Sequence, residues 1–378
     1  MIKKGMIFTL LLILLIHHIP GLATASGSVS ARNAILMEQN SGRVLYEKKA
    51  HDRQRIASIT KIMTAILAIE SGKLDEQVKV SSRAAGTEGS SLYLMGGEKT
   101  KLEDLVYGLM LRSGNDAAVA IAEHVGGSLE GFVFLMNQKA AEIGMENTHF
   151  ANPHGLDDHE NHYSTAYDMA LLTRYAMNNE TYRKISGTKV HRAPNPNESW
   201  DRVWKNKNRL LTELYKYTTG GKTGYTKRAK RTLVTTAAKG ELELIAVTLN
   251  GPDDWNDHIF MYERGFEQYD LAEILPAGTI KGIKEQVYRG KVYLDHSFDY
   301  PITQDEEEKV RVQYKLLKPD GAGEEAAIPD VVGKAVVYLD NDIIMEMPIY
   351  YKHQAVKKKN FLDRFKNIFM SAAGIEHG

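Results

Sequence analysis

The chain has 378 residues, contains no cysteine, and balances 48 basic residues with 48 acidic residues. This length is enough for two domains, each with its own core. The balanced charge gives no sign of the concentrated basic face that binds nucleic acid, so no nucleic-acid partner is expected. The lack of cysteine excludes disulfides, thiolate metal sites and a cysteine nucleophile.

Residues 1–25 are predicted to form a signal peptide. Lys3 and Lys4 give a positive start, residues 6–16 are an apolar run, and Ala23-Thr24-Ala25 fits a cleavage site. The apolar run is shorter than a membrane-spanning helix requires. We therefore expect an exported protein whose mature chain begins near Ser26. An uncleaved N-terminal anchor is the alternative, and it too implies export.

Residues 26–270 mix strand-like and helix-like patterns and are predicted to form one α/β domain. Apolar runs on either side of Asn40-Ser41-Gly42 predict a hairpin at residues 34–46. The sequence also predicts helices at 59–71, 102–111, 116–125 and 164–178, and strands at 232–235 and 242–249. Strands at both ends with helices between them indicate an α/β sandwich with a helical insert.

Residues 271–351 carry short β-rich runs separated by turn residues, without a long helical pattern. The predicted strands are 286–288, 291–294, 310–316, 335–339 and 343–350. This pattern indicates a small all-β domain. Because it shows no constellation of catalytic residue types, its expected role is spacing or docking.

Residues 352–378 are predicted to form a basic amphipathic tail helix. Three lysines at 357–359 precede apolar residues at helical spacing, which are Phe361, Leu362, Phe365, Ile368 and Phe369. A basic helix with phenylalanines suits the headgroup region of an anionic bilayer, so this tail is expected to bind a membrane surface. A helix packed on the protein itself and a frayed tail are the alternatives.

Three short motifs carry the candidate chemistry. They are Ser58-Ile59-Thr60-Lys61, Ser113-Gly114-Asn115 and Lys222-Thr223-Gly224. Each alone is a weak signal, because a serine at a helix start is commonly an N-cap and Ser-Gly-Asn is an ordinary turn. In this order and at these wide separations they match the motif set that marks penicillin-binding proteins and class A β-lactamases.

The first two motifs supply a nucleophile and groups that move its proton. A serine hydroxyl needs a nearby base, and residues i and i+3 share a helix face, so Lys61 is expected beside Ser58. Lysine acts as a base only when burial or other cations lower its pKa, and Lys222 is a candidate for such a cation. Ser113 is a candidate proton relay, and Asn115 is expected to hold a substrate amide and to contact Lys61.

The third motif is expected to hold the substrate. Lys222 and Thr223 at a strand edge bind a carboxylate through charge and hydroxyl donation. Gly224 lets another backbone come close, so an extended peptide is expected to add beside this strand. The amide of Tyr225 is expected to share an oxyanion hole with the amide of Ser58.

The chain resembles the low-molecular-mass penicillin-binding proteins of the serine D-alanyl-D-alanine carboxypeptidase family, the S11-type peptidases. Residues 41–48, 85–91, 152–156 and 162–168 are similar to further family segments, and the resemblance covers about 31–269. It implies the α/β penicillin-binding and β-lactamase-like transpeptidase fold, an antiparallel sheet flanked by helices with a helical subdomain. A small C-terminal all-β domain and an amphipathic tail helix complete the family plan.

The resemblance also implies an activity. Ser58 attacks the penultimate D-Ala of a peptidoglycan stem peptide ending in D-Ala-D-Ala, the last D-Ala leaves, and water hydrolyses the ester, which limits cross-linking. β-Lactam antibiotics are expected to bind, and no cofactor or metal is expected. The implied location is the outer face of the cytoplasmic membrane or the cell wall space.

Two carboxylate-binding arginines of the family have no clear match. Lys207 is the candidate replacement for the arginine before the third motif. A second family arginine falls where this chain has Gly251-Pro252-Asp253-Asp254, so the acidic replacement leaves that contact without an obvious donor.

Several other functions share some of these features. A β-lactamase has the same motifs and often uses a glutamate between the second and third, where acids occur at 142, 146, 157, 158 and 160. A zinc peptidase would use histidines at 149, 154, 159 and 162, although no recognised zinc spacing occurs. A peptidoglycan endopeptidase on the same fold and a non-catalytic wall-binding module, which would not need both Ser58 and Lys61, are further alternatives.

Overall fold

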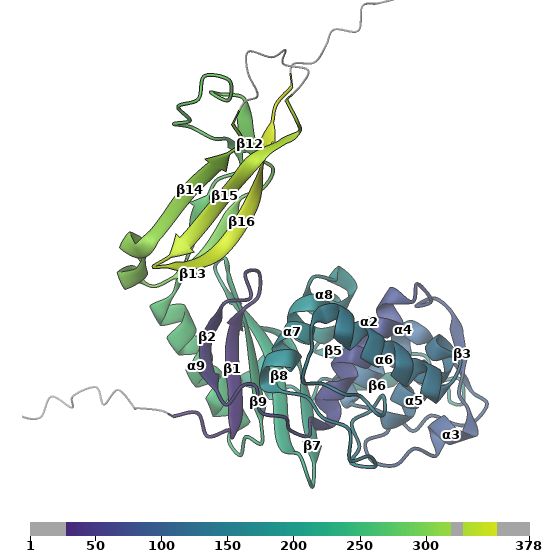
Figure 1. Ribbon diagram of the computed structural model, residues 1–378. Helices are drawn as coiled ribbons and strands as arrows, with labels where there is room; N and C mark the ends of the chain where they lie inside the picture. Colours follow the sequence, from purple (N-terminus) through teal and green to yellow (C-terminus); the bar gives the residue numbers. More distant parts are fainter. Residues whose placement is uncertain (1–27, 319–327, 354–378) are drawn as a thin grey trace, which may run out of the picture. The chain divides into compact units, whose positions relative to one another are not determined.

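The computed structural model describes residues 28–318 and 328–353, which form two compact units divided between Tyr269 and Asp270 (Figure 1). The predicted signal peptide lies outside the described residues, as does the predicted tail helix from residue 354 onward.

The first unit is built on a five-stranded antiparallel sheet. Its strands are β1 (Asn33–Glu38), β2 (Val44–Lys48), β7 (Thr218–Thr226), β8 (Lys230–Lys239) and β9 (Leu242–Leu249). Their order across the sheet is β2-β1-β9-β8-β7. The predicted hairpin and both predicted strands are therefore confirmed. Since β7 lies at one edge, the strand that carries the third motif pairs on one side only within the described sheet.

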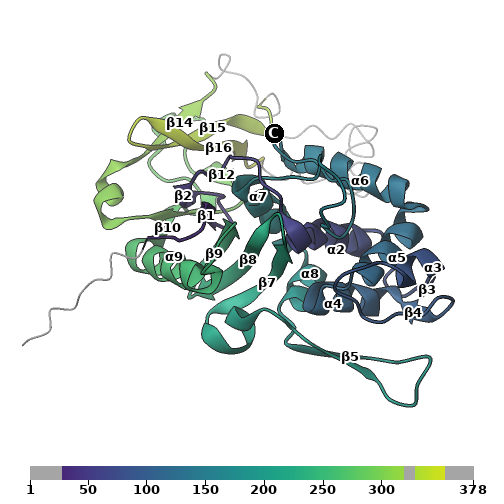
Figure 2. The same ribbon diagram turned by 90° about the horizontal axis from the view of Figure 1, so that it is seen from below.

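Helices cover this sheet and form a helical subdomain beside it (Figure 2). The helices are α2 (Lys61–Glu70), α3 (Ser82–Ala85), α4 (Leu102–Arg112), α5 (Asn115–Gly126), α6 (Leu129–Ile143), α7 (Ala166–Met177), α8 (Glu180–Ser186) and α9 (Asp254–Gln268). Short pieces complete the unit, namely the 3-10 turn η1 (Ala57–Thr60), the π-helical turn η2 (Leu210–Leu214), and the two-stranded sheets β3 (Gln77–Lys79) with β4 (Lys99–Lys101) and β5 (Val190–Ala193) with β6 (Arg202–Lys205).

The two faces of the sheet pack against different helices. Side chains alternate along a strand, and on β1 the side chain of Ile35 joins the core that contains α2 and α7, whereas Leu36 approaches Gly265 of α9. The sheet is thus covered on both faces, and of its two edge strands, β2 and β7, it is β7 that carries the third motif.

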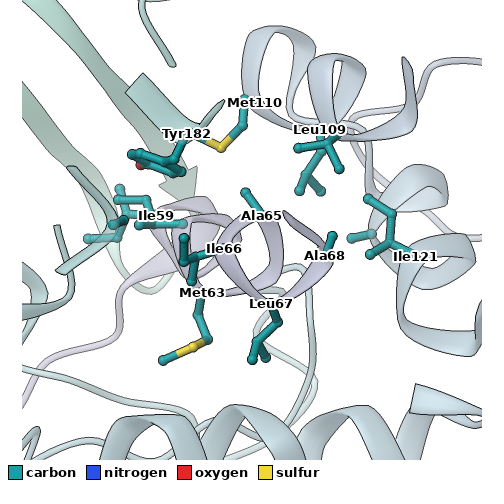
Figure 3. Packing of buried hydrophobic residues seen from close by; sticks show 14 of the residues in the cluster. Ile59, Met63, Ala65, Ile66, Leu67, Ala68, Leu109, Met110, Ile121 and Tyr182 are labelled. Carbon is teal, nitrogen blue, oxygen red and sulfur yellow. The ribbon is translucent and has the colours of Figure 1, made fainter. Parts of the chain in front are cut away.

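The helix α2 is the centre of the helical subdomain. All of its residues except the last are buried, as expected for a helix enclosed by other elements on every side. Figure 3 shows this helix surrounded by Leu109 of α4, Ile121 of α5 and Tyr182 of α8. This packing fixes the start of α2, next to which Ser58 lies.

The second unit is almost entirely β-structure. A five-stranded sheet has the order β11-β12-β16-β15-β14, and β10 pairs with β13. The strands are β10 (Asp270–Leu275), β11 (Gly278–Thr279), β12 (Val292–Leu294), β13 (Phe298–Ile302), β14 (Val310–Leu316), β15 (Val331–Leu339) and β16 (Asp342–Tyr351), with the 3-10 helix η3 (Gln304–Lys309). Their inner faces form a separate core that includes Val332, Val337 and Ile349.

One predicted strand in the second unit is wrong. Residues 286–288 form a turn in which the Tyr288 N–H donates to the carbonyl of Glu285, 3.0 Å away. The Tyr288 side chain is buried in the core of the unit. The β-like composition of this short run therefore reflects burial of a side chain rather than strand pairing.

No single helix among residues 28–318 and 328–353 combines the length and apolar character needed to cross a bilayer. The pair α5 and α6, bent by 84°, meets both criteria only when the two helices are taken together.

Candidate active site

The first motif lies where η1 joins α2. Ser58 is on η1, Lys61 is the first residue of α2, and the Lys61 Nζ lies 3.0 Å from the Ser58 Oγ. The sequence predicts one continuous helix here, but the first turn is a 3-10 turn. The preceding residue, Ala57, has a left-handed backbone with φ 49°, a strained conformation of the kind that clusters at functional sites.

The Lys61 amine is enclosed by oxygen atoms. Its Nζ donates to Asn115 Oδ1 at 2.7 Å and to the carbonyl oxygen of His154 at 2.8 Å. The side chain is fully buried. Burial, followed by the charges of Lys222 and Lys207, holds the pKa of Lys61 well below its usual range. This amine is therefore suited to accept a proton near neutral pH.

The second motif lies in the turn between α4 and α5. Ser113 ends α4 with φ 66°, and Asn115 begins α5. Besides accepting from Lys61, the Asn115 side chain donates through Nδ2 to the carbonyl of Glu88 at 2.7 Å. Its backbone N–H donates to the carbonyl of Ser90 at 2.6 Å. The predicted contact between Asn115 and Lys61 is therefore present, and residues 88–90 fix it in place.

Asp116 was missed by the sequence analysis although it follows the second motif directly. Its fully buried carboxylate accepts the Ser91 hydroxyl at 2.6 Å and the backbone N–H groups of Leu92 and Leu94 at 2.9 and 3.2 Å. These bonds hold residues 91–94 against the start of α5. An acid in the first turn of a predicted helix is the only signal that the sequence offers for this role.

The third motif lies on the edge strand β7. Lys222 is buried, and its Nζ donates to the carbonyl of Thr223 at 2.8 Å. Burial, followed by the charge of Lys207, lowers the pKa of Lys222 to about 7. Next along the strand, a Cβ on Gly224 would lie 3.0 Å from the Ser58 backbone nitrogen. Glycine thus lets β7 approach the nucleophile, and the following residue, Tyr225, is largely exposed.

Lys207 belongs to the same site. Its Nζ lies 3.5 Å from the Ser90 Oγ, and its charge lowers the pKa of both Lys61 and Lys222. The structure therefore groups three ammonium side chains, which favours the binding of an anion.

The acidic segment after β9 has a local partner. The Oδ1 of Asp254 accepts from Arg231 of β8 through Nε at 3.0 Å and Nη2 at 2.6 Å. Asp254, which lies where the family has its second arginine, is therefore paired with Arg231 on the neighbouring strand.

A hydrogen-bonded chain that the sequence analysis also missed supports the residue before the nucleophile. His162 Nδ1 accepts the N–H of Ala151 at 3.0 Å, so its Nε2 donates to the Thr60 Oγ1 at 2.8 Å. The Thr60 hydroxyl donates to the carbonyl of Ala57 at 2.8 Å. Burial lowers the pKa of His162 to about 3, which keeps the ring neutral. This chain holds the strained backbone that presents Ser58.

Two of the four histidines proposed as alternative zinc ligands have other partners. His162 acts as described above, and His154 Nδ1 accepts the N–H of Leu156 at 3.2 Å. Among the described residues, no three His, Asp or Glu side chains are arranged to hold a metal ion.

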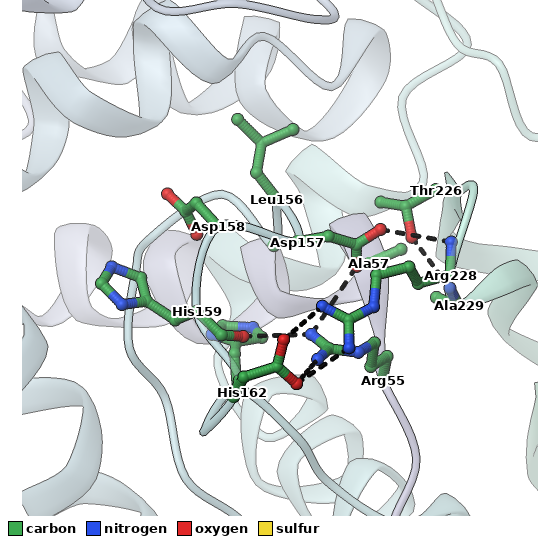
Figure 4. Close-up of polar contacts among 12 residues, drawn as sticks. Arg55, Ala57, Leu156, Asp157, Asp158, His159, His162, Thr226, Arg228 and Ala229 are labelled. Carbon is green, nitrogen blue, oxygen red and sulfur yellow. Dashed lines mark hydrogen bonds and ion pairs between the residues drawn. The ribbon is translucent and has the colours of Figure 1, made fainter.

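A group of ionic contacts lies beside the first and third motifs (Figure 4). Glu160 accepts from Arg228 at 2.6 and 2.8 Å and from Arg55 at 2.6 Å. Asp157 accepts the backbone N–H of Arg228 at 3.2 Å. These contacts join the segment before η1, the 157–160 loop and the turn after β7.

Two protein-family models match consecutive parts of the chain. Residues 21–253 match the D-alanyl-D-alanine carboxypeptidase family of S11 peptidases, and residues 269–358 match the C-terminal domain of penicillin-binding protein 5. Among curated proteins, the D-alanyl-D-alanine carboxypeptidase DacF of Bacillus subtilis is 33% identical over 366 residues, covering 92% of this chain and 91% of that protein. DacC of Escherichia coli is 38% identical over 290 residues, covering 70% and 68%.

Solved structures show the same fold. Penicillin-binding protein 5 from Haemophilus influenzae aligns with a TM-score of 0.72 and 27% identity, covering 88% of this chain and 99% of that one. The carboxypeptidase DacD from Francisella tularensis aligns with a TM-score of 0.66 and 26% identity, covering 88% and 95%. The predicted fold is therefore confirmed for both units. Because the sequence match extends along nearly the whole chain, this protein belongs to the D-alanyl-D-alanine carboxypeptidase family of serine peptidases.

Proposed function

We propose that the protein is an exported serine carboxypeptidase that removes the terminal D-Ala from peptidoglycan pentapeptide stems, with Ser58 as nucleophile and Lys61 as base. The observation that carries this proposal is the surroundings of the Lys61 amine. Two of its contacts, Asn115 Oδ1 and the carbonyl of His154, are oxygens that only accept hydrogen bonds. Its third contact is the Ser58 hydroxyl.

These contacts define the direction of proton transfer. A neutral amine has two N–H bonds and one lone pair. The two acceptor oxygens take the N–H bonds, which leaves the lone pair toward Ser58 Oγ, 3.0 Å away. Lys61 therefore accepts the hydroxyl proton as Oγ bonds to the carbonyl carbon of the penultimate D-Ala.

The remaining motif residues complete the cycle. The amides of Ser58 and Tyr225 stabilise the oxyanion. Its collapse breaks the C–N bond to the last D-Ala, and the proton held by Lys61 passes through Ser113 to the leaving nitrogen. Lys61, neutral again, takes a proton from water, whose oxygen attacks the ester. The tetrahedral intermediate then breaks its bond to Ser58 Oγ, which takes the proton back from Lys61, so the shortened stem is released and the Ser58 hydroxyl and the neutral amine are both restored.

The terminal carboxylate of the substrate binds beside Lys222, Thr223 and Lys207. The support is the grouping of the Lys222 and Lys207 amines in one site, where burial and then the charge of Lys207 lower the pKa of Lys222 to about 7. A bound carboxylate offsets the repulsion between the ammonium groups and adds charge-assisted hydrogen bonds.

The test is mass spectrometry of the intact protein after exposure to penicillin and, separately, to a peptide ending in D-Ala-D-Ala. The expected results are a long-lived penicillin adduct on the proteolytic fragment that contains Ser58, and release of D-Ala from the peptide. Rapid hydrolysis of a chromogenic β-lactam would favour a β-lactamase instead. The structure gives that alternative little support, because Glu160 is held by two arginines and Asp158 by Asn152.

The pKa of Lys222 predicts an alkaline limb in the pH profile. The charged form, which binds the carboxylate, is present below about pH 7 and is lost above it in the free enzyme. We therefore expect kcat/KM for a D-Ala-D-Ala peptide to fall as pH rises past this value. Lys222→Arg keeps its charge and should move the limb to higher pH. An unchanged limb in that variant would assign it to another group.

We further propose that the protein acts at the outer face of the cytoplasmic membrane, held there by its C-terminal tail. The support is the predicted signal peptide together with the basic apolar sequence after Lys352. Deleting residues 353–378 is expected to move the protein from sedimented membranes into the supernatant while peptidase activity is retained. A truncated protein that still sediments with membranes would show that the tail is not the anchor.

A further inference from the structure

A basic cavity of about 400 Å³ lies beside the turn that follows β7. Three arginines line it, Arg53, Arg55 and Arg228, together with Tyr163 and Asn250. Residues 53–55 come shortly before the nucleophile, and residue 228 follows the strand of the third motif. The basic cavity is therefore lined by residues that are close in sequence to the nucleophile and to the strand of the third motif.

The charges around the basic cavity do not cancel. Arg55 and Arg228 share the carboxylate of Glu160, and Asp157 lies 3.9 Å from Arg55. Arg53, in contrast, donates only to a neutral amide, Asn147 Oδ1, at 3.1 and 3.3 Å, and its guanidinium lies 5.0 Å from the centroid of the Tyr163 ring. Among the described residues, no carboxylate is within ion-pair distance of Arg53. Three guanidinium groups therefore face two carboxylates, and the cavity suits an additional anion.

The orientation of the bound stem follows from the third motif. The C-terminal carboxylate is expected at the Lys222 end of β7, and Gly224 lies against Ser58. A peptide seated on this edge with its scissile carbonyl at Ser58 runs antiparallel to β7. Its upstream residues therefore pass Thr226 and approach Arg228 and the basic cavity.

We propose that the basic cavity binds a free carboxylate of the stem peptide, the α-carboxylate of the γ-linked D-glutamate two residues before the penultimate D-Ala. This inference rests on the proposed carboxypeptidase function. Extended chain advances about 3.3 Å per residue, so from Gly224 to Arg228 the span is at most about 13 Å. The D-glutamate lies two residues and one γ-linkage before the scissile carbonyl, which is about the same length. The dibasic residue between them lies closer to the scissile carbonyl and would sit beside Tyr225 and Thr226.

The test compares two pentapeptides that differ by one group. Both end in Lys-D-Ala-D-Ala, and the second-position D-glutamate carries either its free α-carboxylate or the neutral amide. For the wild-type protein we expect kcat/KM to be about five- to tenfold higher for the carboxylate form, and the ratio to decrease at high salt. In Arg53→Gln the ratio should fall to about one. The matched control Lys79→Gln removes an exposed cation on β3 and should keep the wild-type ratio.

The ratio of kcat/KM for the two peptides is measured on the same protein sample, so a general loss of active protein does not change it. Arg53→Lys keeps the charge and should retain part of the preference, which makes a second variant available if Arg53→Gln folds poorly. A wild-type ratio near one, or a preference that survives in Arg53→Gln, would overturn the proposal while leaving the carboxypeptidase function intact. Failure to cleave either peptide, with no penicillin adduct on Ser58, would overturn both.

Discussion

Ser58→Ala is expected to abolish both release of D-Ala and labelling by penicillin. The variant lacks the hydroxyl oxygen that lies 3.0 Å from the Lys61 amine and that would form the ester. Loss of a serine nucleophile lowers turnover by on the order of 10⁴- to 10⁶-fold in comparable enzymes. The measurements are steady-state release of D-Ala and the mass of the intact protein after exposure to penicillin.

Ser71→Ala is a suitable control because it removes a hydroxyl just after the other end of α2, where Ser71 donates to the carbonyl of Ala68 at 2.7 Å. It should keep both activities. An adduct that still forms in Ser58→Ala would identify a different nucleophile and refute the assignment.

Lys61→Met is expected to lower the rate of acylation by about 10³-fold or more, because the nearest proton acceptor is removed. Methionine fills most of the volume and adds no charge. The carbonyl oxygens of Asn115 and His154 lose a donor, which costs about 1–3 kcal/mol in the free energy of unfolding. This cost is smaller than the about 5–15 kcal/mol by which folded domains are typically stable, so the variant should fold.

Lys61→Arg separates the two roles of this residue. Arginine retains positive charge but stays protonated, so it cannot act as a base. Both variants should therefore lose acylation measured by stopped-flow mixing with a fluorescent penicillin, with folding checked by thermal unfolding. Wild-type acylation in Lys61→Arg would mean that charge, not proton transfer, is what position 61 supplies.

The parts of the site that local spacing determines could be predicted from the sequence. The three-residue separation of Ser58 and Lys61 brings the two side chains together even though the turn is 3-10 rather than α-helical. The sequence predicts a strand after the third motif, whereas the motif itself lies on β7, an edge strand that was not predicted. Motif order was enough to associate Asn115 with Lys61.

The supporting contacts could not be predicted, because they depend on how distant segments pack. His162 and Thr60 are far apart in sequence, and nothing in either local pattern links them. Gly155 is a similar case, since a Cβ there would lie only 1.9 Å from the carbonyl oxygen of Ala57. These residues act on the backbone before Ser58 only after the helical subdomain has assembled.

Two long helices were not predicted, and in α9 the polar composition of the buried face explains why. No helix was expected for α6 or α9, although both are 15 residues long. In α9 the buried residues include Asp257 and His258. Its inner face therefore contains polar groups that a search for apolar periodicity does not count.

The central sheet has a consequence for how the chain acquires its structure. Strand β1, at the start of the first unit, pairs with β9, near its end, from Asn33 opposite Leu249 to Glu38 opposite Leu244. Such pairing between distant segments slows folding, because a large loop must close before the pairing stabilises it. During synthesis the sheet cannot close until almost the entire unit has been made. If the chain is exported as proposed, this strand order keeps the sheet from closing before the strand β9 has been made.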